Sequence, residues 1–265
     1  MKSSNPVLSR ISAAAQQPRY TVPGQGAPAG YQAGGYPEVV QSGHVDRMTV
    51  DDVVVKTVTL LATTAVFAAI TWAVVPLEVM RPVLYASMFL GVIVGLIISF
   101  AQVTNAAVIL GYAVVEGVFL GIISKAYEHF FEGIVLQAVI ATLSVFLAMA
   151  ALYKLKIIRA TPKFMKIVIG AAAGLGVVML VNFVIYLFTD SVGPLRDGGP
   201  IAIGFSLVCI VVAALMFVVN FKQIEDGIAA GLPRKYGWLG AFGILVELVW
   251  LYLEMLRLIS YFSED

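Results

Sequence analysis

Two carboxylates and one guanidinium lie in the last apolar run of the chain, residues 246–258. A charge in hydrocarbon is expensive, so such side chains normally face a bundle interior, a partner or water. Glu247 and Glu254 are seven residues apart, close to two helical turns, and therefore share one helix face. Glu254 and Arg257 are three apart and can pair on the same helix. The pattern is typical of a proton or cation site inside a helical bundle.

The composition places these residues in a membrane protein. Of 265 residues, 60% are hydrophobic and 12% are charged, which is about half the charged fraction of a soluble domain. Several apolar runs reach the roughly 20 residues that a helix needs to cross a bilayer. The net charge of +1 gives no bulk electrostatic case for nucleic acid. We expect an all-α, polytopic protein whose main partner is the lipid bilayer.

Two regions follow from the distribution of apolar runs. Residues 1–46, rich in Gly, Pro, Gln and Ser, predict a disordered cytoplasmic tail, because they carry too little apolar surface to order. Residues 47–265 predict a seven-helix transmembrane domain, with helix caps at Thr49 and at Thr104–Asn105. The predicted spans are 52–75, 83–101, 105–124, 133–153, 164–188, 201–220 and 236–261.

The Lys and Arg residues predict the orientation. With the N-terminus in the cytoplasm, thirteen of the 17 fall on the cytoplasmic side, and Arg81, Lys125, Arg196 and Arg257 fall on the other. This distribution favours a C-terminus outside. A re-entrant seventh segment, with both ends inside, is an alternative that the same count allows.

Few other polar residues lie at membrane depth. Glu116 lies in the third span and Asn182 in the fifth. An amide there commonly bonds a neighbouring helix, and a buried glutamate can be a structural ion pair. The two histidines, His44 and His129, lie outside the spans, so the zinc-protease motif HExxH is missing. We therefore expect neither an enzyme nor a resident cofactor or metal site.

Several segments resemble the Bax inhibitor-1 (transmembrane Bax inhibitor motif) family, in particular its bacterial branch with a flexible N-terminal tail. The resemblance covers about residues 48–261. The most specific segment is WLYLEMLR at 250–257, which is similar to the Leu-Tyr-Leu-acid element of the family's last helix. The other segments are YAVVEGVFLG at 112–121, LYK at 152–154, TPKF at 161–164 and NFKQIE at 220–225.

The resemblance implies six helices around a hydrophobic seventh and a pH-sensitive calcium leak. It also implies a gate that pairs an acid at the end of the sixth helix with Glu254 in the seventh. The sixth-helix position falls on Asn220, where the family usually has Asp. Glu225 or Asp226, one to two turns further on, and Glu247 are the replacement acids that the sequence offers.

Two main functions remain open, beside a third option, a proton-coupled transporter. The first is a pH-sensitive cation leak channel of the bacterial cytoplasmic membrane, passing calcium transiently, with Glu254, Glu116, Asn220 and Glu247 on the ion pathway. Supporting residues are Arg257, Glu225, Asp226 and Asn182. The second is a non-transporting regulator that binds another membrane protein, such as a protease or secretion complex.

Overall fold

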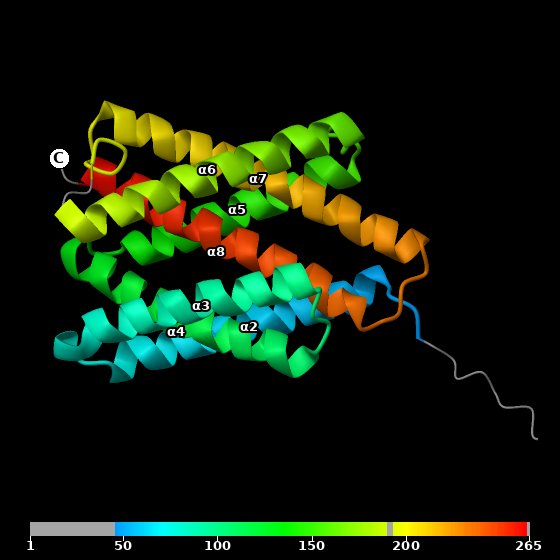
Figure 1. Ribbon diagram of the computed structural model, residues 1–265, viewed down its shortest axis with the longest axis horizontal. Coiled ribbons are helices and arrows are strands. Elements are labelled where there is room, and N and C mark those ends of the chain that lie inside the picture. Colours follow the sequence, from blue (N-terminus) through cyan, green and yellow to red (C-terminus); the bar gives the residue numbers. More distant parts are fainter. Residues whose placement is uncertain (1–45, 190–192, 264–265) are drawn as a thin grey trace, which may run out of the picture. The chain divides into compact units, whose positions relative to one another are not determined.

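The computed structural model describes residues 46–189 and 193–263. Within these residues the chain is helical, and seven helices are long and apolar enough to cross a membrane (Figure 1). The predicted tail lies outside the described residues, apart from Asp46. The elements are α2 (Val50–Val74), the 3-10 helix η1 (Leu77–Val79), α3 (Met80–Ala101), α4 (Ala106–Phe130), α5 (Ile134–Lys154), α6 (Pro162–Thr189), α7 (Pro200–Ala229) and α8 (Tyr236–Ser263).

Both predicted helix caps are confirmed. The Thr49 hydroxyl accepts a hydrogen bond from the Asp52 amide at 3.2 Å, at the start of α2. The Asn105 carboxamide accepts one from the Ala107 amide at 2.9 Å, at the start of α4. Each bond satisfies an N–H group that the first helical turn leaves without an intrahelical partner.

Helix α7 continues well past its predicted end at residue 220, to Ala229. Hydrophobicity falls after Asn220, but nothing there stops a helix. The helix ends only where Gly231 adopts a left-handed backbone (φ 68°) and Pro233 follows. The fall in hydropathy therefore marks the end of the apolar run, whereas the helix itself continues to Ala229.

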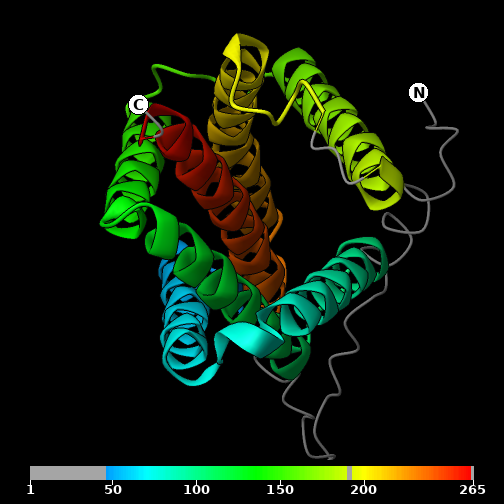
Figure 2. The same ribbon diagram turned by 90° about the vertical axis from the view of Figure 1, so that its left-hand side faces the viewer.

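Helix α8 is the centre of the bundle. It packs against α2, α4, α5 and α7, while α3 packs on α4 and α6 packs on α7 (Figures 1 and 2). In its most apolar window 61% of the residues are buried, against 6% for α6. The predicted plan of six helices around a hydrophobic seventh is therefore confirmed. Helix α8 is also continuous over 28 residues, which is long enough to span and favours a full crossing over the re-entrant alternative.

Glycines allow α4 to approach both of its neighbours closely. A Cβ atom at Gly121 would lie 2.5 Å from the carbonyl oxygen of Ala68 on α2. On the other side, Gly91 and Gly95 of α3 allow a close approach, because Glu116 and Tyr112 of α4 occupy the space that side chains there would need. Small residues that let backbones approach are a common basis of helix packing in membranes.

We expect Gly121→Ala to lower the midpoint of thermal unfolding in detergent. The added methyl group meets the Ala68 carbonyl and the Thr71 Cβ (2.9 Å), and overpacking of this kind costs about 1–3 kcal/mol. Gly111→Ala is the matched control, because a Cβ there meets nothing within 4 Å. Equal midpoints for the two variants would show that the α2–α4 contact is not tight.

Candidate functional site

Glu254 is the centre of a buried ionic cluster. Glu254 is only 1% exposed. Arg196 donates to both carboxylate oxygens, from Nη1 to Oε2 and from Nη2 to Oε1, each at 3.2 Å. Arg257 donates from Nη1 to Oε1 at 2.8 Å, so the predicted pairing on one helix is confirmed. Two guanidiniums thus neutralise one carboxylate, and the cluster keeps a positive charge.

Arg196 reaches Glu254 from the loop between α6 and α7. The loop turns at Gly193 (φ 66°), whose carbonyl accepts the Arg196 amide at 3.1 Å. The guanidinium lies 5.2 Å from the ring centroid of Phe205 on α7, a cation–π contact. A two-point bond between guanidinium and carboxylate fixes both orientation and distance. The loop is therefore fastened to the central helix through one side chain.

The cluster borders a cavity of about 540 Å³. Asn182 of α6, predicted as a supporting residue, lines this cavity together with Arg196 and Arg257. The remaining lining residues are mainly aromatic: Tyr127, Phe131, Met179, Phe183, Tyr186, Ser260 and Tyr261. A solute that entered this cavity would meet the two guanidiniums before the carboxylate, because Glu254 itself is buried behind them.

Glu247 lies on the same face of α8 as Glu254, two turns nearer the start of the helix. Its residue is 6% exposed, and its Oε2 atom has no hydrogen-bond partner within the described residues. Between the two acids, Trp250 shares this face. The Trp250 indole and the Ser206 hydroxyl of α7 interact with Glu254, although neither makes a well-formed hydrogen bond in the described part of the chain. The α7–α8 interface thus contains polar groups with unused bonding capacity.

Glu116 lies in a different place. Its carboxylate is directed at α3, where Oε1 would be 3.0 Å from a Cβ atom at Gly91, and it interacts with Tyr112 one turn earlier. Glu254 instead faces α7 and the Arg196 loop. The two carboxylates therefore belong to separate sites and do not face each other across the bundle axis.

The acid gate that the resemblance implied does not form as expected. Asn220 of α7 lies beside Gly243, to whose carbonyl its Nδ2 donates at 3.4 Å. Gly243 precedes Glu254 by eleven residues, which is about 16 Å along a helix. Helices α7 and α8 run antiparallel, so the α7 residues near Glu254 come from the first part of that helix, such as Ser206. Asn220 cannot pair directly with Glu254.

Glu225 and Asp226, the replacement acids that the sequence offers, lie away from Glu254. Their side chains are 62% and 58% exposed, and both pair with Lys222, at 3.6 and 2.8 Å. Glu225 also accepts a hydrogen bond from Tyr153 of α5. They lie even further along α7 than Asn220, at the opposite end of the helix from Ser206. Helix geometry excludes them as partners of Glu254.

A second ionic cluster joins helices at the other end of the bundle, and the expectations from the sequence did not include it. Asp52 of α2 accepts from Lys56 Nζ at 2.5 Å and from Arg234 Nε at 2.7 Å. Lys56 also donates to the Arg234 carbonyl at 2.6 Å. A Cβ atom at Gly237 would lie 2.5 Å from Asp52 Oδ2, so only glycine lets the start of α8 approach this closely. We call this group the Asp52 cluster.

Two signals could have indicated these clusters. Asp52 and Lys56 stand at the i, i+4 spacing of a helical ion pair. Arg196 stands alone in a Gly- and Pro-rich loop. From the sequence, Arg196 contributes only to the predicted orientation. A buried acid such as Glu254 requires a cation nearby, and Arg196 is such a cation. Nothing local in the sequence states that the two meet across 58 residues.

The described part of the chain offers no ready metal site, since it contains no group of three or more His, Cys, Asp or Glu side chains placed to hold an ion. Fold and site together define a multi-pass membrane protein with a buried, arginine-paired glutamate in its central helix.

The chain belongs to the Bax inhibitor 1 like family, whose model matches residues 5–264. The match includes most of the N-terminal segment, which the resemblance at 48–261 did not cover. No curated protein gives a significant match to the chain.

We expect Asp52→Asn to lower the free energy of unfolding by about 3 kcal/mol, because it leaves the buried Lys56 without its nearest counter-charge. Asp51→Asn, an exposed acid in the same helical turn, is the control and should change it by less than about 0.5 kcal/mol. Urea titration in detergent measures both. Adding Lys56→Met to Asp52→Asn should restore much of the loss, and failure to do so would contradict the charge argument.

Proposed function

We propose that this protein is a pH-sensitive cation leak channel with calcium among its permeant ions. The observation that carries the proposal is the closed ionic pair between Glu254 and the Arg196 loop, at the wall of a cavity of about 540 Å³. Buried acids in a membrane bundle are typical of ion and proton pathways. Membership of the Bax inhibitor 1 like family is consistent with this assignment.

Arg196 acts as a built-in cation in the closed state. Its guanidinium occupies both oxygens of Glu254, so a passing ion must displace it to reach the carboxylate. The positive charge of Arg257 adds to the barrier. Movement of the Arg196 loop away from α8 exposes Glu254 and, beyond it, Glu247. We infer that this movement opens the pathway.

Protonation is the physical origin of the proposed pH sensitivity. When Glu254 takes up a proton it loses its charge, and the Arg196 guanidinium loses the partner that holds the loop. The closed pair is therefore stable at high pH and is released as the pH falls through the titration of Glu254. The leak should rise in acid.

The spacing of the acids suits passage better than storage. Glu247 and Glu254 are separated by about 10 Å along α8, so a single ion meets one carboxylate at a time. Calcium prefers six to eight oxygen ligands, and one carboxylate with carbonyls and water gives only weak binding. Conduction requires such weak sites, because an ion must leave as readily as it enters.

The setting follows from the distribution of basic residues. The Asp52 end of the bundle has most of the Lys and Arg residues and faces the cytoplasm in our proposal. The Arg196 cavity then faces the opposite side of a bacterial cytoplasmic membrane, where external pH reaches it directly. We infer that the protein works without catalysis.

We expect Arg196→Gln to raise calcium flux into dye-loaded liposomes at pH 8 several-fold and to flatten the increase between pH 8 and pH 6. Removing the guanidinium leaves Glu254 accessible at every pH. Glu254→Gln should flatten the pH dependence as well, because its side chain can no longer change charge.

Arg81→Gln is the matched control. Arg81 is an exposed arginine in the first turn of α3, and α3 begins at the same end of the bundle as the Arg196 loop, so its loss changes net charge equally and leaves the closed pair intact. Flux that keeps the wild-type pH profile in both Arg196→Gln and Glu254→Gln would contradict the proposed gate.

A second candidate function is regulation of another membrane protein through α6. Gly170 and Gly174 stand four residues apart on this helix, and a Cβ atom at either would meet nothing within 4 Å. Such a pair is typical of a close helix–helix contact. If α6 binds a partner helix, Gly174→Leu should remove a crosslinked partner and leave liposome flux unchanged. If neither the wild-type protein nor Gly174→Leu gives a crosslinked partner, this candidate is excluded.

A further inference from the structure

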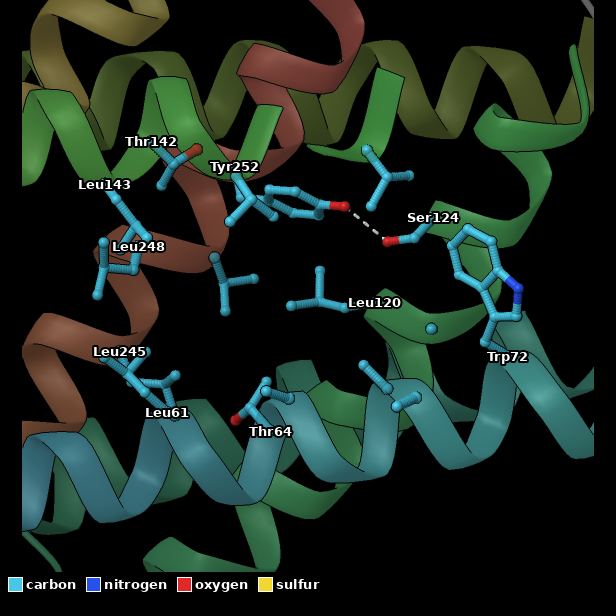
Figure 3. Close-up of a pocket in the computed structure, with 17 residues that line it drawn as sticks. Leu61, Thr64, Trp72, Leu120, Ser124, Thr142, Leu143, Leu245, Leu248 and Tyr252 are labelled. Atoms are coloured by element: carbon cyan, nitrogen blue, oxygen red, sulfur yellow. Dashed lines mark hydrogen bonds between the residues drawn. The ribbon is translucent and has the colours of Figure 1, made fainter. Parts of the chain in front are cut away.

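A separate apolar cavity of about 400 Å³ lies between α2, α4, α5 and α8 (Figure 3). Its size is within the range of small-molecule sites in proteins. Its lining includes Leu61 and Trp72 of α2, Leu120 of α4, Leu143 of α5 and Leu248 of α8. None of the acids of the proposed ion pathway lines it.

The lining favours an apolar occupant. It includes four hydroxyl side chains, and each already has a partner. Thr64 donates to the Ala113 carbonyl at 3.1 Å and Thr142 to the Ala138 carbonyl at 2.7 Å. Ser124 and Tyr252 bond each other at 2.7 Å, as Figure 3 shows. A polar ligand would have to break these bonds, whereas a hydrocarbon chain would not.

The mouth of the cavity opens toward lipid. Lining residues of α2 and α5 are exposed on the bundle surface, among them Ala65, Ala69 and Leu143. The cavity runs along α2 from Leu61 to Trp72, about 16 Å at the helical rise. This stretch lies inside a membrane span, so the molecules that reach the mouth are those dissolved in the bilayer.

A lysine lies next to the cavity, beside its lining residue Trp72. Lys125 Nζ donates to the carbonyls of Trp72 at 2.9 Å and Val75 at 2.7 Å, at the end of α2. Carbonyl dipoles hold the ammonium but do not neutralise its charge, and no carboxylate of the described residues forms a salt bridge with it. The nearby Glu128 is bonded instead to the amides of Gly133 and Val135 at the start of α5.

We propose that this cavity binds an anionic phospholipid of the bilayer, with one acyl chain in the cavity and the phosphate at Lys125. The position of Lys125 at the end of a membrane span corresponds to the headgroup level. The apolar cavity thus accommodates an acyl chain, and Lys125 lies where the headgroup of the same lipid would be.

The lysine supplies the selectivity. The acyl chain gains little by moving from the bilayer into the cavity, because lipid tails are as apolar as leucine. An ammonium that attracts an anionic headgroup distinguishes between lipids, and one such charge is worth about fivefold in affinity. The site should therefore prefer phosphatidylglycerol to phosphatidylethanolamine.

Native mass spectrometry of the full chain with these two phospholipids tests the proposal. The wild-type protein should retain phosphatidylglycerol about fivefold better than phosphatidylethanolamine. Lys125→Gln should bring the two to parity. Ala65→Leu with Ala69→Leu, which fills the mouth, should reduce retention of both lipids.

The controls make the same changes of charge and size away from the cavity. Lys166→Gln removes an exposed lysine of α6, and Ala148→Leu enlarges an exposed residue of α5 outside the cavity; neither should change retention. Unchanged lipid preference in Lys125→Gln would overturn the proposal, as would unchanged retention in the filled variant. Retention of oleate in place of phospholipid, lost in the filled variant, would overturn it in favour of a fatty-acid site.

Discussion

The cost of an unpaired charge in hydrocarbon is the constraint on which this structure depends. Glu254 lies in the most buried helix of the bundle, where an isolated carboxylate would be strongly destabilising. The chain meets this cost with two guanidiniums, one from the same helix and one from the α6–α7 loop. The loop is thereby tied to the core, and in our proposal protonation of Glu254 releases it. Stability and the proposed gating rest on the same pair.

The two ends of α8 use ion pairs in different ways. At its start, Asp52 is bonded to Lys56 and Arg234 at 2.5 to 2.7 Å, in a contact so close that Gly237 must be glycine. At its other end, the Arg196 bonds to Glu254 are longer, at 3.2 Å, and border a cavity. The first cluster holds α2, the α7–α8 loop and α8 together as a fixed base. The second is the cluster that opens in our proposal.

Sequence reasoning predicted the fold well and the site in part. Apolar runs of span length, with caps at Thr49 and Asn105, are local signals, and each helix forms near its predicted position. Glu254 with Arg257 was also predictable, because their spacing lies within one helix. The partner Arg196 was not, since the contact depends on how the α6–α7 loop folds over α8. For the same reason the register of α7 against α8, which separates Asn220 from Glu254, appears only in three dimensions.

The most direct test of the account is the distance between the Arg196 loop and the bundle as a function of pH. Spin labels at the exposed positions Pro194 and Phe130, in a Cys209→Ala background, report this distance by double electron–electron resonance in liposomes. The account predicts a shift to longer distances between pH 8 and pH 5 in the wild-type chain, and the long distances at both pH values in Glu254→Gln. The same short distances at both pH values in both chains would contradict it.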